Sequence, residues 1–276
     1  MLWLNILVAL LIVFCITALL FVLAIMPKTK KHEWTDEIKK YTYAHRGLFS
    51  RENKVPENSL LAFEKAIEKG FGFELDVHLT ADGKLVVIHD SSLKRTAGVD
   101  IDVSKSTYEE ISTYRLEGTD EKIPLFDEVL ALNGGKVPMI VELKSDNNTK
   151  ELVKEVVKAL RNYSGIYCTE SFAPDIVYAL KKSAPDIMRG QLACDIRKGN
   201  KKFPVVGGFI LKNLVTNFLT KPDFIAYAYN DRTSFAFSLC RKLFKPTEVS
   251  WTVKNAEAMK KAQDAGACVI FDSFVP

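Results

Sequence analysis

Several classes of protein are excluded by what this sequence of 276 residues has little of. Its five cysteines stand singly, at positions 15, 168, 194, 240 and 268, with no CxxC or Cys/His spacing. The sequence therefore shows neither a zinc motif nor a disulfide framework. Charge of one sign is also scarce, since the formal net charge is only +4 and no basic stripe carries interleaved aromatic residues. This balance argues against a nucleic-acid-binding protein.

The first 26 residues differ from the rest because they carry no charged side chain. A helix of this length, at about 1.5 Å per residue, can cross a hydrocarbon core of about 30 Å. A buried core helix would show a polar face, and a signal peptide would begin with Lys or Arg and end in an A-x-A-like site. Neither feature is present, so residues 1–26 are predicted to be an uncleaved, single-pass transmembrane anchor.

Basic residues flank this segment only on its C-terminal side, where Lys28, Lys30 and Lys31 follow it. The positive-inside rule then predicts that the C-terminal side lies in the cytoplasm. We expect residues 27–40 to be a charged linker and residues 41–276 to form the folded domain, facing the inner leaflet.

Short apolar runs alternate with helical patterns from Tyr41 onward. We expect strands at 41–45, 72–77, 85–89, 137–143, 165–170, 187–191, 206–210, 223–227, 248–252 and 268–272. We expect amphipathic helices at 58–69, 125–133, 149–162, 173–183, 232–243 and 255–265. Such alternation indicates parallel βαβ units, and their number is close to eight. Because a G-x-G-x-x-G fingerprint is missing, an α/β fold of the (β/α)8 TIM barrel type is favoured, with a doubly wound sheet as the alternative.

Carboxylates end two of the apolar runs, which is where the active sites of such barrels lie. Glu74 and Asp76 are two residues apart on one strand, so they point to the same face, and Glu142 ends a later strand. Burying these groups unpaired is costly, and a hard divalent cation such as Ca²⁺ or Mg²⁺ would offset that cost. Pairing with Lys or Arg is the alternative, and the residues alone do not decide between the two.

Imidazole and cationic groups stand at similar strand ends. His45 and His89 both terminate apolar runs and could form a general acid and base, because imidazole with a pKa of about 6.5 suits proton transfer at neutral pH. His78 either reaches the site or merely ends its strand. Arg46 offers a planar fork for phosphate and Lys144 a point charge, with a salt bridge to a carboxylate as the alternative for each.

A series of motifs runs through the folded part of the chain. They are His45-Arg46-Gly47, Pro56-Glu57-Asn58-Ser59, Glu74-Leu75-Asp76-Val77, Thr80-Ala81-Asp82-Gly83, His89-Asp90, Leu93-x-Arg95-Thr96, residues 123–130 (IPLFDEVL), Glu142-Leu143-Lys144, Trp251-Thr252-Val253 and the terminal GACVIFD. In order and spacing they resemble the glycerophosphodiester phosphodiesterase family. The resemblance implies a (β/α)8 barrel with a small insertion after an early strand. It also implies metal-dependent hydrolysis of a phosphodiester to sn-glycerol 3-phosphate and an alcohol.

The resemblance further implies a role for individual residues. The ligands of one divalent cation would be Glu74, Asp76 and Glu142. The acid/base residues would be His45 and His89. The substrate-binding residues would be Arg46 and Lys144 at the phosphate, Glu57 of the PEN motif, and Trp251 as a wall of the pocket.

The sequence also departs from the family pattern. Ser59 stands where Thr is commoner, the segment HDSSL lacks the usual Pro or Thr, the ending VIFDSFVP places a bulky Phe271 there, and the segment between His89 and Glu142 is short. A short segment and a membrane anchor would suit a lipid, so a lysophospholipase D-type activity on membrane lysophospholipids is an alternative. Two others are a non-catalytic barrel that binds a phosphorylated ligand and a phosphatidylinositol phospholipase C-like enzyme. The intact histidines and carboxylates argue against the non-catalytic barrel. The Glu74-x-Asp76 pair and the PENS motif argue against the phospholipase C-like enzyme.

Overall fold

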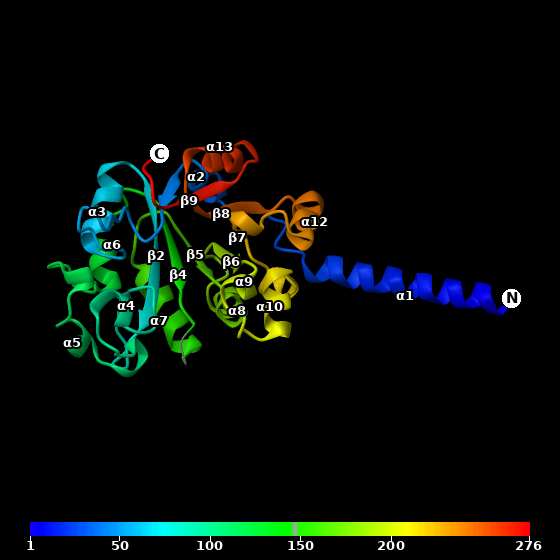
Figure 1. Cartoon of the computed structure of the whole chain (residues 1–276), viewed down its shortest axis with the longest axis horizontal. Coiled ribbons are helices and arrows are strands. Elements are labelled where there is room, and N and C mark those ends of the chain that lie inside the picture. Colours follow the sequence, from blue (N-terminus) through cyan, green and yellow to red (C-terminus); the bar gives the residue numbers. More distant parts are fainter. Residues whose placement is uncertain (146–147) are drawn as a thin grey trace.

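A closed β-barrel forms the centre of the molecule in this computed structural model, which describes residues 1–145 and 148–276 (Figure 1). Within these residues, eight strands are parallel: β1 (Thr42–Ala44), β2 (Gly72–Leu79), β4 (Met139–Leu143), β5 (Tyr167–Ser171), β6 (Arg189–Ala193), β7 (Phe224–Ala228), β8 (Thr247–Val253) and β9 (Cys268–Phe271). The barrel closes because β1 pairs with β2 on one side and with β9 on the other. The predicted (β/α)8 barrel is confirmed, and the doubly wound alternative is wrong.

The six amphipathic helices expected from the sequence surround the barrel. They are α3 (Leu60–Glu68), α6 (Phe126–Asn133), α7 (Thr149–Arg161), α8 (Pro174–Ser183), α12 (Phe235–Phe244) and α13 (Ala256–Asp264). In α7, the apolar residues recur every three or four positions, and Leu152, Val156 and Leu160 are buried against the sheet. This periodicity was sufficient to predict the helix from the sequence, because apolar residues at that spacing lie on one face of a helix.

Residues 206–210, predicted to be a strand, belong instead to helix α10 (Val205–Lys212), so that prediction is wrong. A short apolar run does not distinguish a strand from a helix by itself. The β6–β7 connection, which includes α9 (Ile196–Gly199), α10 and α11 (Asn217–Thr220), crosses outside the barrel and leads to β7. The strand between β6 and β8 is instead β7, residues 224–228, which pairs with both of them.

The strand predicted at 85–89 is β3 (Leu85–Val87), which pairs antiparallel to β2 outside the barrel. It opens an insertion that contains α4 (Lys94–Ala97), η1 (Val103–Lys105), α5 (Tyr108–Ile111) and η2 (Leu116–Gly118). This insertion has a small buried cluster of its own that includes Val86, Ile88, Leu93 and Ile111. It follows the early strand β2, where the family resemblance implies an insertion.

The N-terminal helix α1 (Leu2–Ala24) projects away from the barrel (Figure 1). It is long and apolar enough to cross a membrane. Residues 27–40 then run along the barrel and include α2 (Thr35–Ile38). Ile38 is buried, and its carbonyl accepts a 2.9 Å hydrogen bond from the Tyr43 hydroxyl. The segment predicted to be a charged linker is therefore packed against the barrel.

Candidate active site

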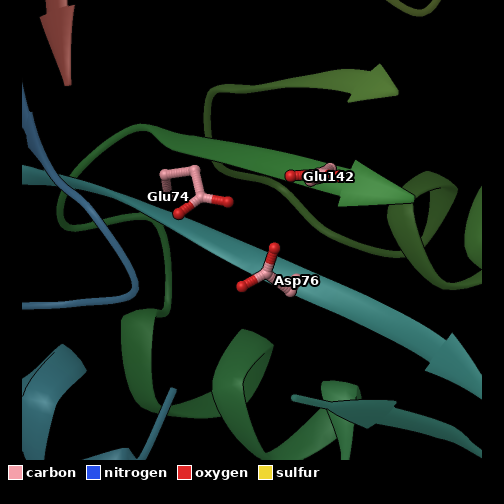
Figure 2. Close-up of side chains that lie close together, drawn as sticks. All are labelled: Glu74, Asp76 and Glu142. Atoms are coloured by element: carbon pink, nitrogen blue, oxygen red, sulfur yellow. The ribbon is translucent and has the colours of Figure 1, made fainter. Parts of the chain in front are cut away.

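Three carboxylates converge at neighbouring strands of the barrel (Figure 2). Glu74 and Asp76 lie on β2, and Glu142 lies on β4, whose register places it beside Asp76. One oxygen of each side chain lies within 4.8 Å of those of the other two. All three residues are buried, with only 2% of Glu74 exposed. The structure thus brings together the three residues expected to bind a cation.

Burial and the closeness of these carboxylates shift their pKa values. Burial raises the pKa of Glu74 well above its ordinary value, and the charges of Asp76 and Glu142 raise it further. Burial also raises the pKa of Glu142 to about 7, against the opposing effect of Lys144. Burial would raise the pKa of Asp76 as well, but the positive charge of Lys144 lowers it below its ordinary value.

Lys144 lies between two of the three carboxylates. Its Nζ is 2.7 Å from both Asp76 Oδ1 and Glu142 Oε1, and Arg46 Nε lies 3.6 Å from Asp76 Oδ2. The alternative that the carboxylates pair with Lys or Arg is therefore met for Asp76 and Glu142. Within the described residues, Glu74 has no ion pair with Lys or Arg, and its Oε2 accepts the backbone N–H of Arg46 at 3.0 Å.

The residues fit a hard divalent cation in addition to Lys144. Glu170 on β5 adds a fourth buried carboxylate, and its Oε2 has no hydrogen-bond partner in the described part of the chain. Burial and the charge of Glu142 raise its pKa well above the ordinary value. The four carboxyl groups outnumber the two cationic groups beside them, Lys144 and Arg46, and the donor set consists of oxygen atoms, as Ca²⁺ and Mg²⁺ require. The cluster is compatible with a divalent cation.

Each of the two predicted acid/base histidines is held by a carboxylate. His45 follows β1, and its Nδ1 is 3.2 Å from Asp272 Oδ2, just after β9. His89 Nδ1 is 2.6 Å from Asp90 Oδ1. Because an ionised carboxylate only accepts, Nδ1 donates in both pairs and Nε2 is left as the second ring nitrogen. His45 Nε2 lies 4.0 Å from Glu74 Oε2, so this imidazole faces the acidic cluster.

Both imidazoles are easier to deprotonate than usual. Burial lowers the pKa of His45, partly opposed by its hydrogen bond to Asp272. Burial lowers the pKa of His89 to about 4, partly opposed by the charge of Asp76. Both shifts favour the neutral ring, which has a lone pair on Nε2 that can accept a proton.

A chain of ion pairs connects His89 with Arg46. Asp90 Oδ2 accepts from Arg95 Nε at 2.6 Å, and Arg95 also binds Glu57 through both terminal nitrogens, at 2.7 and 2.9 Å. Glu57 Oε1 in turn accepts from Arg46 Nη1 at 2.7 Å. Glu57, expected to contact substrate, is therefore engaged by two guanidinium groups, which hold its pKa below the ordinary value against the effect of burial.

Local backbone geometry explains why Gly47 follows this arginine. Gly47 has φ +78°, and a Cβ there would lie 2.8 Å from Ala62 Cβ. A side chain at this position would be strained and would collide with α3. Glycine thus lets the loop after β1 turn so that Arg46 can approach Glu57 and Asp76.

The partners of the site residues are not evident from the sequence. Asp272 and Asp90 hold the histidines, Arg95 bridges Asp90 to Glu57, and Asn58 Nδ2 donates to Asp76 Oδ2 at 2.7 Å. Asp90, Arg95, Asn58 and Asp272 all belong to the motifs, and Asp272 directly follows the last strand. Their position in the motifs marks these residues as candidates for the site. The sequence does not show which side chain each of them contacts.

A cavity of about 310 Å³ opens beside the cluster. It is lined by residues that include His45, Arg46, Glu74, His89, Glu142 and Trp251. Trp251, which lines this cavity, packs edge-on against Phe172, with ring centroids 5.4 Å apart. His78, in contrast, is buried on β2 with Nε2 3.2 Å from the carbonyl oxygen of His89, and it does not line the cavity.

A closed (β/α)8 barrel with carboxylates and two carboxylate-held imidazoles at the C-terminal ends of its strands has the layout of a barrel hydrolase. The sequence model of the glycerophosphoryl diester phosphodiesterase family matches residues 45–275. The chain belongs to this family, and the resemblance found in the motifs is confirmed.

Known relatives agree with this assignment. A glycerophosphodiester phosphodiesterase of Caldanaerobacter subterraneus is 36% identical over 166 residues, which cover 56% of this chain and 67% of that protein. Lysophospholipase D GDPD1 of Rattus norvegicus is 34% identical over 126 residues, covering 41% of this chain and 39% of that protein. A phosphodiesterase of Oleispira antarctica, solved with the product sn-glycerol-3-phosphate, shares the fold with a TM-score of 0.69 and 21% identity, covering 84% of this chain and 92% of that one.

Proposed function

We propose that the chain hydrolyses glycerophosphodiesters to sn-glycerol 3-phosphate and an alcohol. The observation that carries this proposal is the shared cavity, which is lined by two imidazoles, the Arg46 guanidinium and two of the clustered carboxylates. Family membership and the names of the relatives support the same activity. The phosphodiester would lie with its phosphate toward Arg46, whose planar fork suits two phosphate oxygens.

The two histidines divide the proton transfers. One Nε2 takes the proton of the nucleophile, which is either water or the 2-hydroxyl of the substrate glycerol. The other imidazole, whose protonated form the negative charge of a bound phosphodiester would favour, gives its Nε2 proton to the leaving alcohol oxygen. Asp272 and Asp90 each hold an Nδ1–H, so they orient the rings and stabilise the imidazolium when it forms.

Glu74, Asp76 and Glu142 would hold one divalent cation, Ca²⁺ or Mg²⁺. When bound, such an ion polarises a phosphoryl oxygen and stabilises the charge that develops on it. Lys144, already 2.7 Å from two of these carboxylates, would supply positive charge within the carboxylate cluster. Arg46 and Lys144 would thereby favour the more anionic transition state over the ground state.

A lysophospholipase D-type activity is the second candidate, because one feature of the surface favours it. A hollow of about 800 Å³ adjoins the catalytic cavity and shares Phe49, Lys254 and Asp272 with it. It offers room for the acyl chain that a lysophospholipid carries on its glycerol, and a relative bears the lysophospholipase D name. Turnover of glycerophosphocholine against lysophosphatidylcholine in detergent separates the two, since a preference for the lysolipid would favour the second.

We further propose that α1 anchors the protein as a single-pass membrane helix, with residues 1–26 as anchor, 27–40 as connection and 41–276 as catalytic domain. Lys28, Lys30 and Lys31 support a cytoplasmic domain by the positive-inside rule. Protease treatment of sealed, right-side-out cells tests this orientation: the domain should stay intact until the membrane is opened, and cleavage beforehand would contradict it.

Substitution of the histidines tests the activity. His45→Ala and His89→Ala should each lower kcat by about 10²-fold or more, since each removes a proton-transfer group. His32→Ala is the matched control, because His32 bonds to the carbonyl oxygen of Asp186, away from the cavity, and should leave turnover unchanged. Thermal unfolding of each variant verifies the fold. Near-normal turnover in both folded active-site variants would remove the acid/base assignment.

A further inference from the structure

Exposed apolar side chains gather around the base of α1. Among the described residues after α1, nine large apolar side chains are exposed, and seven of them lie in α10, α11 and α12. These seven are Val205, Val206, Phe209, Phe218, Leu219, Phe235 and Leu243. Figure 1 shows α10 and α12 at the end of the barrel from which α1 projects. Apolar exposure in the folded domain is therefore concentrated beside the proposed anchor.

The base of α1 is packed against the same helices. Ile25 is buried with Leu214, which follows α10, and with Phe237 and Cys240 of α12. Asn217 Nδ2 of α11 donates to the Ile25 carbonyl oxygen at 3.0 Å. These contacts fix the direction in which α1 leaves the barrel, so the position of the bilayer relative to the domain follows from them.

The exposed length of α1 locates the membrane surface. Residues 2–20 are all exposed, and at about 1.5 Å per residue they form a stretch of about 28 Å. This is close to the hydrocarbon thickness of about 30 Å, so the boundary falls near Phe21. Phe21 stacks on Phe235 with ring centroids 6.3 Å apart, and Phe235 is 74% exposed. An exposed aromatic ring at this level lies in the membrane interface.

Positive charge accompanies the apolar residues of α10. Lys201 and Lys202 directly precede Phe203 and are exposed, and neither has an ion pair with the residues that the structure describes. Val206, 71% exposed, and Phe209 follow within two turns. Basic residues beside an exposed apolar helix are typical of a surface that rests on anionic lipids.

We propose that residues 201–209, together with Phe235, form a membrane-docking face that rests on anionic lipid headgroups beside α1. The inference rests on the membrane anchor proposed above and adds a second contact with the bilayer. The face begins shortly after β6, whose Leu192 lines the catalytic cavity. Docking there places the segment that follows β6 against the lipid surface.

Lipid-borne quenchers test this face in the full chain. The background carries Cys15→Ser and Cys194→Ser, because the other three cysteines are buried. Val206→Cys is labelled with an environment-sensitive fluorophore, and the protein is reconstituted in vesicles of phosphatidylcholine and phosphatidylglycerol with nitroxide-labelled lipid. Glu109→Cys on α5, at the end of the domain away from α1 in Figure 1, is the matched control. Fractional quenching at position 206 should be about threefold greater than at 109 or more, since an interfacial side chain lies within about 10 Å of the headgroup boundary.

Charge reversal tests the part played by the lysines. Lys201→Glu with Lys202→Glu should lower the quenching at position 206 at least about twofold, because both attractions to anionic lipid become repulsions. Lys154→Glu with Lys158→Glu on α7 makes the same change in net charge and should leave quenching unaltered. Equal effects of the two pairs would overturn the proposal.

Vesicle flotation separates this proposal from the proposed anchor. If the protein floats but positions 206 and 109 are quenched equally, the docking face is refuted and the anchor stands. If emission at 206 instead shifts with protein density and not with quencher, a second copy covers the face and the proposal fails. Failure to float refutes the anchor and the docking face together, while turnover of a soluble substrate would continue to report on the activity.

Discussion

Glu74→Gln should change the stability of this protein in opposite directions with and without a divalent cation. Without the cation, the Glu74 carboxylate is buried beside Asp76 and Glu142, and both raise its pKa after burial itself. At neutral pH the folded protein must either keep this charge buried or bind a proton to neutralise it, and both cost free energy. Glutamine avoids both costs, and its amide oxygen can still accept the backbone N–H of Arg46, now 3.0 Å from Glu74 Oε2. The variant therefore avoids that cost and keeps a hydrogen bond.

The expected magnitudes are large enough to measure. Replacing a buried charge by a neutral group of the same shape stabilises by about 1–2 kcal/mol, at the low end of the range for such changes. At about 2–4 °C per kcal/mol for a domain of this size, the Tm without cation should rise by about 2–8 °C. Wild-type protein with cation at about 100 times Kd should gain about 2.7 kcal/mol, or about 5–10 °C. The variant should lose most of that second gain.

Thermal unfolding of the full chain in detergent, in EDTA and in a series of Mg²⁺ or Ca²⁺ concentrations, measures both effects. Glu68→Gln at the exposed end of α3 is the control, and it should follow wild type in every condition. The reasoning is refuted if Glu74→Gln responds to the cation as strongly as wild type does. It is equally refuted if the variant is less stable than wild type in EDTA.

Three further predictions concern the metal, the ion-pair chain and the base of the barrel. Thorough chelation should abolish turnover, and added Mg²⁺ or Ca²⁺ should restore it; turnover that survives chelation would rule out the metal role. Arg95→Gln should lower kcat/KM by about 10–100-fold, because it releases both Asp90 and Glu57, and Arg95→Lys should recover only part since an ammonium cannot bridge two carboxylates in the same way. Equal activity of Arg95→Gln and wild type would show that the ion pairs of Arg95 do not position His89. Asp223→Ala should destabilise by about 3–5 kcal/mol, because it leaves the buried Arg189 without its carboxylate and breaks the 2.6 Å contact to Lys28. Denaturant unfolding measures this loss, and the exposed pair partner Asp100→Ala should cost no more than about 1 kcal/mol.

Local patterns were sufficient for most of the secondary structure. The helical spacing at 149–162 predicted α7 because its apolar residues form one face, and the alternation of strands and helices predicted parallel units. The same kind of signal failed at 206–210, where a short apolar run belongs to α10. Its apolar residues are exposed beside α1, so they are not explained by packing in the barrel.

The catalytic candidates could be found from sequence because a parallel barrel presents its strand ends at one rim. Glu74, Asp76 and Glu142 were recognisable by that rule, and the structure places them together. Which cationic side chain pairs with which carboxylate was not recognisable from the sequence. Lys144 could equally have paired with other carboxylates, and only the register of β2 against β4 places it between Asp76 and Glu142.

The sequence by itself determined the apolar N-terminal helix, the alternation that leads to a barrel and the polar residues that end its strands, because these depend on neighbours only a few residues apart. The tertiary structure alone decided which charges meet. His45 and Asp272 are 227 residues apart in the chain and make contact because β1 and β9 pair when the barrel closes. Barrel closure is a property of all the strands together, so no local pattern specifies which side chains it brings into contact.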